Sequence, residues 1–276
     1  MYRSFLLLLL LPVTLFLHSC TQNPVSEAEE HYRKGNDLVL NLDFVNAKKE
    51  YELCLKLDGN NWRACYQLAN MYEMQGDIRN SFEYYNKALA IKPDFTLGYY
   101  GRANLEEMIS DEKGSLGDIN KAIDANKGFF MSYLARGRKA YAASQFPQAI
   151  SDFNEAVKLR SDFYLVYSMR GSCKFKMGDL PGAISDFETE IKLNPNHAIG
   201  YVNRGVAYAE QKNYRAAIND LTAAIQVDPQ LSQAYIYRGM FEIGANIKDS
   251  ACMDFHTAGQ LKNPQADAYI KQYCGK

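Results

Sequence analysis

Small and apolar residues recur along this chain with a period of 34. At position 8 of each 34-residue unit stand Gly35, Ala69, Ala103, Gly137, Gly171, Gly205 and Gly239, with no insertion between them. Position 20 is also small in every unit, position 27 is small in all but one, where Glu190 stands, and position 24 is apolar or aromatic. Small residues let two helices approach closely, while large ones fill the gap between them. The pattern predicts helix–turn–helix repeats that stack into a solenoid.

The prolines support this register. Pro93, Pro195 and Pro229 fall at position 32, where a second helix must end, and Pro147 and Pro181 fall in its first turn, where a missing N–H costs nothing. The expected repeats cover residues 28–61, 62–95, 96–129, 130–163, 164–197, 198–231 and 232–265. Residues 266–276 should form a short amphipathic capping helix and tail, because a solenoid needs its exposed end covered.

Two columns of charged residues change together from repeat to repeat. Position 7 carries Lys34, then Leu68, then five arginines, while position 23 carries Glu50, then Tyr84, then five aspartates. We therefore expect the first-helix cation and the second-helix carboxylate to touch, within a repeat or across to its neighbour. Each carboxylate is then neutralised by an arginine suited to bidentate pairing, so a structural role is favoured over acid catalysis.

The seven in-register units resemble tetratricopeptide (TPR) repeats over residues 28–265. The resemblance implies an all-α, right-handed superhelical solenoid of seven TPR repeats. It also implies that the first helix of each repeat lines a concave surface through positions 2, 5, 9 and 12. Function is then expected on a surface rather than in a catalytic cleft.

The first repeats carry polar residues at these concave positions. Position 9 holds Asn36, Asn70, Asn104 and Arg138, and position 5 holds Tyr32, Tyr66 and Tyr100. An asparagine ladder resembles the way some TPR grooves hold an extended peptide backbone, because each amide offers a donor and an acceptor. TPR domains that clamp a terminal carboxylate need Lys or Arg at position 5, so the tyrosines argue against a chaperone clamp.

In the later repeats the same columns turn apolar. The stripe consists of Met131, Leu134, Tyr141, Leu165, Phe175, Ile199, Val202, Val206, Ile236, Met240 and Ile243. An amphipathic helix or an apolar segment would select such a surface. The alternative is that the superhelix closes enough to bury these residues against neighbouring repeats.

The N-terminus follows a different pattern. Arg3 precedes an uncharged apolar stretch from Phe5 to Leu17, which is too short to span a bilayer but matches the core of a secretory signal. The site that ends at Cys20 resembles a bacterial lipoprotein cleavage site, which implies that residues 1–19 are removed and Cys20 is acylated. An ordinary signal peptide is the alternative. Residues 20–27 would then be the lipidated cysteine and a linker, and Thr21 in place of Asp favours the outer membrane, facing the periplasm.

An oxidising compartment would permit disulfides. Cys252, in the last repeat, could pair with Cys274 after the cap, and Cys54 could pair with Cys65, although these two also suit core positions. No Cys-x-x-Cys, no metal-ligand histidine spacing and no phosphate, dinucleotide or hydrolase motif occurs, so we expect no cofactor, metal or small-molecule substrate.

The balance of 31 basic and 32 acidic residues leaves no field for nucleic acid. The sequence therefore predicts a non-catalytic, membrane-tethered scaffold that binds a protein or peptide in its concave groove. The alternative is a structural subunit of an envelope assembly that uses its convex face.

Overall fold

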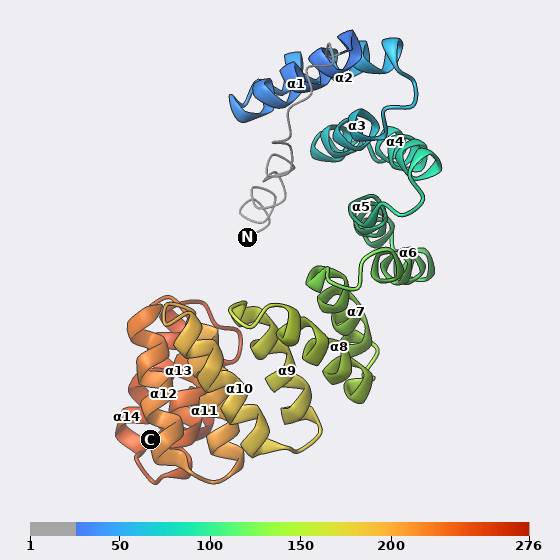
Figure 1. Cartoon of the computed structure of the whole chain (residues 1–276). Helices are drawn as coiled ribbons and strands as arrows, with labels where there is room; N and C mark the ends of the chain where they lie inside the picture. The colour runs from blue at the N-terminus through green and yellow to red at the C-terminus, as the bar shows by residue number, and fades with distance from the viewer. Residues whose placement is uncertain (1–25, 276) are drawn as a thin grey trace.

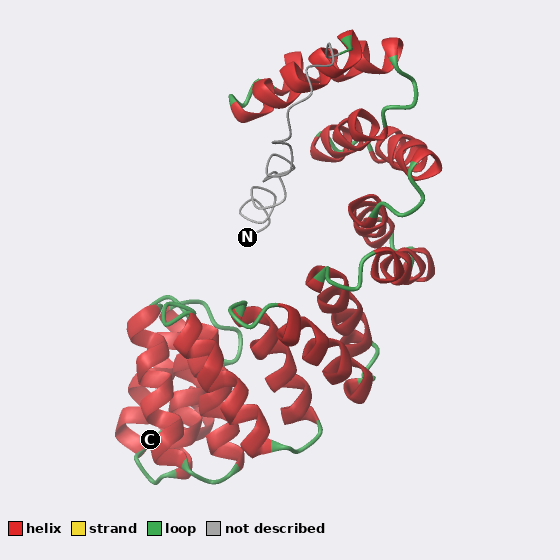
Figure 2. Ribbon diagram, viewed as in Figure 1, coloured by secondary structure: helices red, strands yellow, loops and turns green. Residues whose placement is uncertain are grey.

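A computed structural model describes residues 26–275, and within that span the chain forms helices and no strands (Figures 1 and 2). The helices follow one another in antiparallel pairs, one pair to a repeat. They are α1 (Glu27–Leu40), α2 (Phe44–Leu57), α3 (Trp62–Met74), α4 (Ile78–Ile91), α5 (Thr96–Met108), α6 (Glu112–Ala125), α7 (Phe130–Ala142), α8 (Phe146–Leu159), α9 (Tyr164–Lys176), α10 (Leu180–Leu193), α11 (Ala198–Glu210), α12 (Tyr214–Val227), α13 (Ser232–Gly244) and α14 (Lys248–Gln260). Helices α3, α5, α7, α9, α11 and α13 begin at the first residue of their repeats.

Local sequence signals set the turn between the two helices of a repeat. The residue at position 15 has a positive φ in every repeat, as in Gly76 and Gly178, and this left-handed residue ends the first helix. Two residues later the second helix begins. In five of the seven repeats the side chain before it accepts a hydrogen bond from the third backbone N–H, as Asp77 does from Asn80 and Asp179 from Gly182. The second helices containing Pro147 and Pro181 carry them in the first turn, as expected.

Close approach of the paired helices explains the column of small residues at position 8. A methyl group on Gly137 would lie 2.6 Å from the ring of Phe153, which is fully buried. The same contact recurs between Gly239 and Phe255. Residues at positions 8, 20, 24 and 27 therefore form a core that is repeated along the array, with the aromatic or aliphatic side chain of position 24 at its centre.

The repeats stack into a curved superhelix. The first helices α3 and α5 lie along its inner side and their partners α4 and α6 along its outer side (Figure 1). Successive first helices also contact one another, as α3 does α5 and α9 does α11. The observed architecture is thus the all-helical TPR solenoid that the sequence predicts, and its concave wall is built from first helices.

Two boundaries differ from the sequence-based expectation. The linker was expected to reach Glu27, but α1 begins there, because the Ser26 hydroxyl accepts from the backbone N–H of Glu29. The C-terminal cap is an α-helix only over α15 (Ala266–Tyr269) and continues as a π-helical turn, η3 (Ile270–Cys274). Tyr269 and Tyr273 stack on Phe255 from these two segments and close the last core. The predicted cysteine pair, Cys252 and Cys274, forms a disulfide that fixes the end of this cap to α14.

The expected signal peptide (1–19), the expected acylation site Cys20 and the linker up to residue 25 lie outside the described residues. Over residues 26–275, none of the helices combines the length and the hydrophobicity needed to cross a membrane.

Candidate functional site

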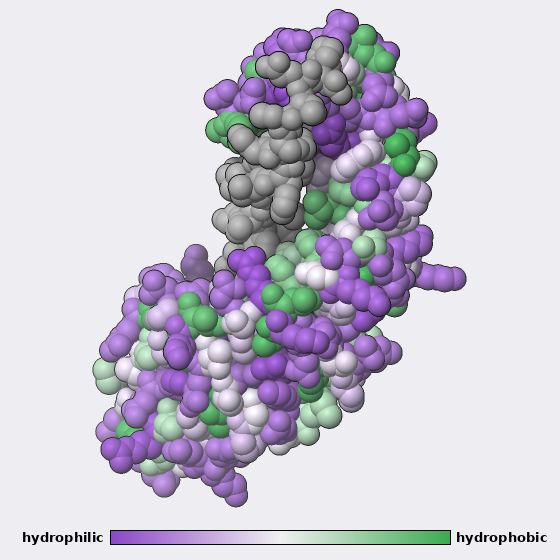
Figure 3. All heavy atoms as spheres, viewed as in Figure 1, coloured by the Kyte–Doolittle hydropathy of each residue, from purple (hydrophilic) through white to green (hydrophobic). Residues whose placement is uncertain are grey.

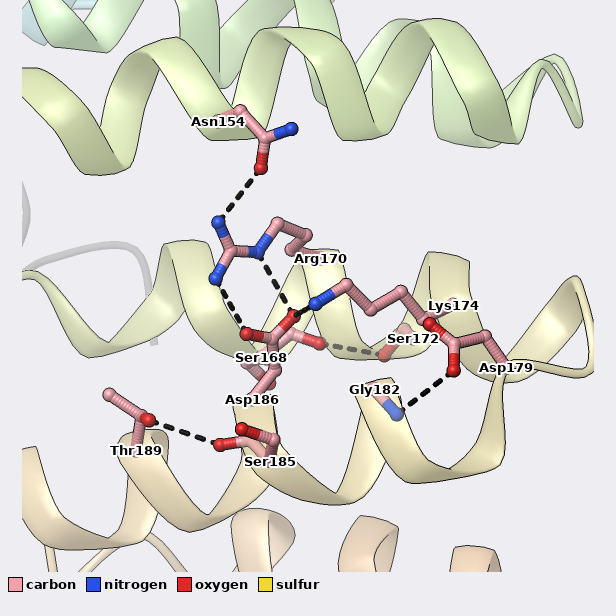
Figure 4. Close-up of polar contacts among 10 residues, drawn as sticks. All are labelled: Asn154, Ser168, Arg170, Ser172, Lys174, Asp179, Gly182, Ser185, Asp186 and Thr189. Atoms are coloured by element: carbon pink, nitrogen blue, oxygen red, sulfur yellow. Dashed lines mark hydrogen bonds and ion pairs between the residues drawn. The ribbon is translucent and has the colours of Figure 1, made fainter.

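Each predicted pair of columns 7 and 23 is an ion pair within one repeat. Arg170 donates from Nε and Nη2 to the two carboxylate oxygens of Asp186 at 3.0 and 2.6 Å, and Lys174 adds a contact of 2.8 Å (Figure 4). Asp186 is almost fully buried. Equivalent bidentate pairs join Arg102 to Asp118, Arg136 to Asp152, Arg204 to Asp220 and Arg238 to Asp254.

A third member of this network comes from the preceding repeat. The remaining guanidinium nitrogen of Arg170 donates to Asn154 Oδ1 at 2.8 Å across the repeat boundary (Figure 4). Asn86, Asn120 and Thr222 accept in the same way from the arginines of their following repeats. All four acceptors occupy position 25, a recurrence that the sequence contains and that our sequence analysis missed. The network is therefore a structural tie between repeats, and its carboxylates are not free for chemistry.

The asparagines of the predicted ladder are partly engaged by their own repeat. Tyr51 donates its hydroxyl to Asn36 Oδ1 at 2.8 Å, and Tyr85 donates to Asn70 Oδ1 at 2.6 Å and lies 2.9 Å from Glu73 Oε2. Both tyrosine rings are buried, and burial raises the pKa of each hydroxyl, so the hydroxyls stay protonated donors. Each amide oxygen thus has a structural partner and keeps one further acceptor position, so the role of Asn36 and Asn70 in the groove stays a prediction.

The third and fourth members of the ladder differ from the first two. Asn104 is half-buried, and no side-chain hydrogen bond engages it within residues 26–275, because Ile119 replaces the tyrosine of position 24 in its repeat. Arg138 is half-exposed and lies 3.9 Å from Glu107. Tyr100 packs edge-to-face on Phe129, and burial raises the pKa of its hydroxyl.

Two side chains expected to line the groove are core residues instead. Tyr32 is 6% exposed, since its ring packs against Tyr51 and beneath the guanidinium of Arg63. Leu134 is 7% exposed and belongs to the cluster around Phe153. Position 5 lies at the edge of the first helix that meets the second helix, which is why its side chains turn toward the aromatic of position 24. The prediction of surface roles for Tyr32 and Leu134 is therefore wrong. Tyr66, half-buried between Tyr85 and Phe95, is an intermediate case.

A pocket opens where the concave columns turn apolar. It has a volume of about 190 Å³ and is formed by α7, α9, α11 and α13, with Phe187 of α10 contributing to its wall. Four residues predicted from the sequence are brought together there, namely Tyr141, Phe175, Val202 and Val206. Ser172, Lys176, Asn203 and Tyr237 complete the lining and were not predicted. Met240 lies outside it and packs into the last core cluster.

Apolar surface and a few polar groups thus meet in this pocket. Val202 is buried, whereas Tyr141, Phe175 and Val206 are half-buried and leave part of their surface accessible. Lys176 is exposed and makes no ion pair with any residue from 26 to 275. Such a surface can hold an apolar side chain and can attract a negative group beside it. We refer to these nine residues as the concave pocket.

The titratable groups elsewhere give no reactive site. Burial raises the pKa of the Cys54, Cys65 and Cys173 thiols to about 11, so these cysteines remain protonated. Burial, together with the nearby Asp118 carboxylate, raises the pKa of Glu106 to about 7. Within the described span, no cluster of three or more His, Cys, Asp or Glu residues is placed to bind a metal ion.

Comparison with known proteins supports the fold. The tetratricopeptide repeat family matches residues 62–95 and 198–231, which are the second and sixth repeats. The C-terminal part of a TPR repeat-containing protein from Cytophaga hutchinsonii is similar in structure, with a TM-score of 0.70 and 16% identity over 86% of this chain and 98% of that chain. A TPR protein from Parabacteroides merdae has a TM-score of 0.61 and 18% sequence identity, over 90% of this chain and 99% of that chain. YrrB, described as a TPR protein with an unusual peptide-binding site, has a TM-score of 0.59 and 23% sequence identity, over 67% of this chain and 95% of that chain.

No curated protein sequence matches the chain. TPR repeats are generally non-catalytic scaffolds for protein interaction. At these identities the structural neighbours establish the fold alone.

Proposed function

We propose that this protein is a membrane-tethered scaffold that binds a protein or peptide segment in its concave groove, with the concave pocket as the anchoring point. The observation that carries the proposal is the meeting of Tyr141, Phe175 and Val206 from three successive first helices around one accessible depression. A preformed apolar pocket with a few polar groups is the usual form of a recognition site. That a TPR protein of similar fold is described as having a peptide-binding site is consistent with this proposal.

The lining defines the chemistry of the segment. The half-buried side chains favour an aliphatic or aromatic residue of the partner, because covering them removes apolar surface from water. Lys176 at the rim favours a neighbouring carboxylate, and Asn203 can hydrogen-bond to the backbone of an extended segment. We therefore infer that the partner presents an apolar residue next to an acidic one.

Crosslinking in intact cells tests the face that binds. A photoreactive amino acid would replace Ser172 in the concave pocket or, as a matched control, Ser185, which is exposed on the outer helix α10. We expect a crosslinked partner from position 172 and not from position 185. The change Lys176→Glu, at an exposed side chain that makes no ion pair within residues 26–275, should weaken the adduct without changing thermal unfolding. Adducts from position 185 alone would refute groove binding and favour the convex-face subunit.

The tether is a separate part of the proposal. Cys20 stands where the apolar run of the leader ends, and its acylation would hold the solenoid at the periplasmic face of the outer membrane. Metabolic labelling with an alkyne-tagged fatty acid should mark the wild-type chain and fail to mark Cys20→Ser. Equal labelling of both would contradict the lipid anchor, and it would leave the concave pocket untouched as a hypothesis.

A further inference from the structure

The outer surface of the first repeat exposes apolar side chains at three positions where the other six repeats carry small, polar or charged residues or proline. The α1–α2 turn and the outward face of α2 expose Leu42, Val45 and Leu53, with exposed fractions of 70%, 68% and 37%. On the face seen in Figure 3, hydrophobic residues appear at this end of the array among hydrophilic ones. Leu40, at the end of α1, adds a further exposed side chain beside the turn.

The repeats themselves supply the comparison. Leu42 occupies position 15, where the other six repeats have Gly, Ser, Lys or Asn, and Val45 occupies position 18, where the others have Arg, Lys, Pro or Asp. At position 26, Leu53 replaces Lys, Glu, Thr or Ala. These columns face outward in each repeat, so packing within the solenoid does not call for apolar residues there.

Leu42 is also unfavourable for its own backbone. Its φ is 61°, in the left-handed region, where a side chain with a Cβ and no local hydrogen bond costs about 1 kcal/mol or more relative to glycine. Leu42 is also the most exposed of the three side chains Leu42, Val45 and Leu53. An exposed leucine at this turn adds no core packing to the fold.

Lysines accompany the apolar side chains along the same helix face. Val45, Lys49, Leu53 and Lys56 follow one another at spacings of three or four residues, so they lie on one side of α2, and both lysines are exposed. Apolar residues interleaved with lysine are typical of helices that lie in a membrane interface, with the ammonium groups among the headgroups. The carboxylates adjacent in sequence to the apolar side chains, Asp43 and Glu52, are half-exposed, and Asp58 follows the end of α2. Asp43 is held at the start of α2 by its hydrogen bonds to Asn46.

The position of this repeat in the chain identifies the occupant. Ser26, where α1 is capped, lies six residues after Cys20, which corresponds to about 20 Å of fully extended chain. We propose that Leu42, Val45 and Leu53 insert into the surface of the lipid bilayer, with Lys49 and Lys56 against the headgroup phosphates. The nearness of the bilayer rests on the proposed acylation of Cys20, whereas the affinity for lipid resides in the repeat itself. The first repeat would then set the orientation of the solenoid on the membrane.

Vesicle flotation of a chain that begins at Thr21 separates the two proposals. Such a chain keeps every described core cluster, all of which lie between Ala28 and Cys274, and it has neither leader nor lipid. It should float with vesicles of phosphatidylethanolamine containing a minor fraction of phosphatidylglycerol. The triple variant Leu42→Ser, Val45→Ser, Leu53→Ser should lose at least about tenfold in partitioning. The control variant Ala223→Ser, at position 26 of the sixth repeat, should float as the wild type does.

Two outcomes would overturn this inference. The first is equal flotation of the triple variant and the wild type, with circular dichroism showing both folded. The second is failure of the wild-type chain to float. If that chain instead forms a dimer in sedimentation that the triple variant does not form, this face is a contact between copies. Loss of acylation in the labelling experiment, by contrast, would remove the anchor and leave the flotation result unchanged.

Discussion

The ion pairs at positions 7 and 23 allow a matched test of what a second cation contributes. The pairs Arg136–Asp152 and Arg170–Asp186 are both bidentate, and each arginine also donates to an asparagine at position 25 of the preceding repeat. The side-chain exposures of the two carboxylates are 3% and 5%. They differ in one respect. Lys174 lies 2.8 Å from Asp186, whereas in the described part of the chain Asp152 has no ion-pair partner other than Arg136.

We expect Arg136→Met to be the more destabilising of two otherwise equivalent changes. It leaves Asp152 buried and unpaired, which costs about 3–5 kcal/mol. Arg170→Met leaves Asp186 paired with Lys174, so the loss should be nearer the value of the charged hydrogen bonds removed, about 1.5–3 kcal/mol. The difference of about 2 kcal/mol is measurable by urea unfolding, with hydrogen exchange to assign the loss to α7–α8 or to α9–α10.

Two further variants make this reasoning refutable. Adding Lys174→Met to Arg170→Met should bring the loss up to that of Arg136→Met, because both carboxylates are then unpaired. Replacing Asp152 by Leu together with Arg136→Met should recover most of the stability, since no buried charge remains. Equal losses from the two single arginine variants, or a larger loss from Arg170→Met, would show that the second cation does not stabilise the buried carboxylate.

Three further predictions follow from contacts in the first four repeats and the sixth. Asn36→Ala should lower the urea midpoint more than Asn70→Ala. It removes the acceptor of the buried Tyr51 hydroxyl, which has no other acceptor within residues 26–275, a loss of about 1–3 kcal/mol, whereas the Tyr85 hydroxyl beside Asn70 keeps Glu73. Equal shifts would contradict this. Gly137→Ala should cost about 1–3 kcal/mol by overpacking against a buried ring and Gly205→Ala less, because the nearest atom to its added methyl is 3.2 Å away rather than 2.6 Å; calorimetry decides between them. The Glu106 carboxyl has a pKa of about 7 in the folded protein, against an ordinary value of 4.5, so the folded state binds this proton more tightly than the unfolded state does. The folded state therefore loses stability as pH rises from about 5 through 7. In thermal melts Glu106→Gln should lose less stability than the wild type over that range, and parallel curves would refute the assignment.

The outer face of the first repeat offers a prediction in which stability and binding move in opposite directions. Leu42→Asn replaces a strained leucine by a residue that tolerates a positive φ. The free energy of unfolding, measured with urea, should therefore rise by about 1 kcal/mol. Vesicle partitioning of the same variant should fall, because an exposed apolar side chain is lost. Asn246, which already occupies the same turn position in the seventh repeat, shows that the fold accepts this residue.

Much of this structure could be predicted from the sequence because its contacts are local and repeated. A repeat packs against itself and its immediate neighbours, so every contact type occurs several times at the same spacing. The arginine of position 7 and the aspartate of position 23 are 16 residues apart in each pair, and their joint replacement by Leu68 and Tyr84 in the second repeat exposed the link without any structure. The small residues opposite the ring of position 24 could be recognised for the same reason.

The surface roles could not be predicted in the same way, because they depend on where a side chain points between two helices. Tyr32 and Leu134 stand at position 5, which the resemblance to TPR repeats places on the concave surface, yet the second helix covers both side chains. The amide oxygen of Asn36 is occupied by Tyr51, whereas that of Asn104 is not, although both residues stand in the same column. The period is the same for every repeat, and it therefore carries no information about such differences.

The sequence by itself determined the number of repeats, the register of the helices and the ion pairs, since these follow from spacings of 34 residues or fewer. Only the tertiary structure decided which apolar columns close into core and which remain open. Tyr141, Phe175, Val206 and Tyr237 come from four repeats, and they surround one pocket because the curvature of the superhelix brings their helices together. That curvature is the sum of small rotations between neighbouring repeats, a quantity that packing sets and that no spacing along the chain records.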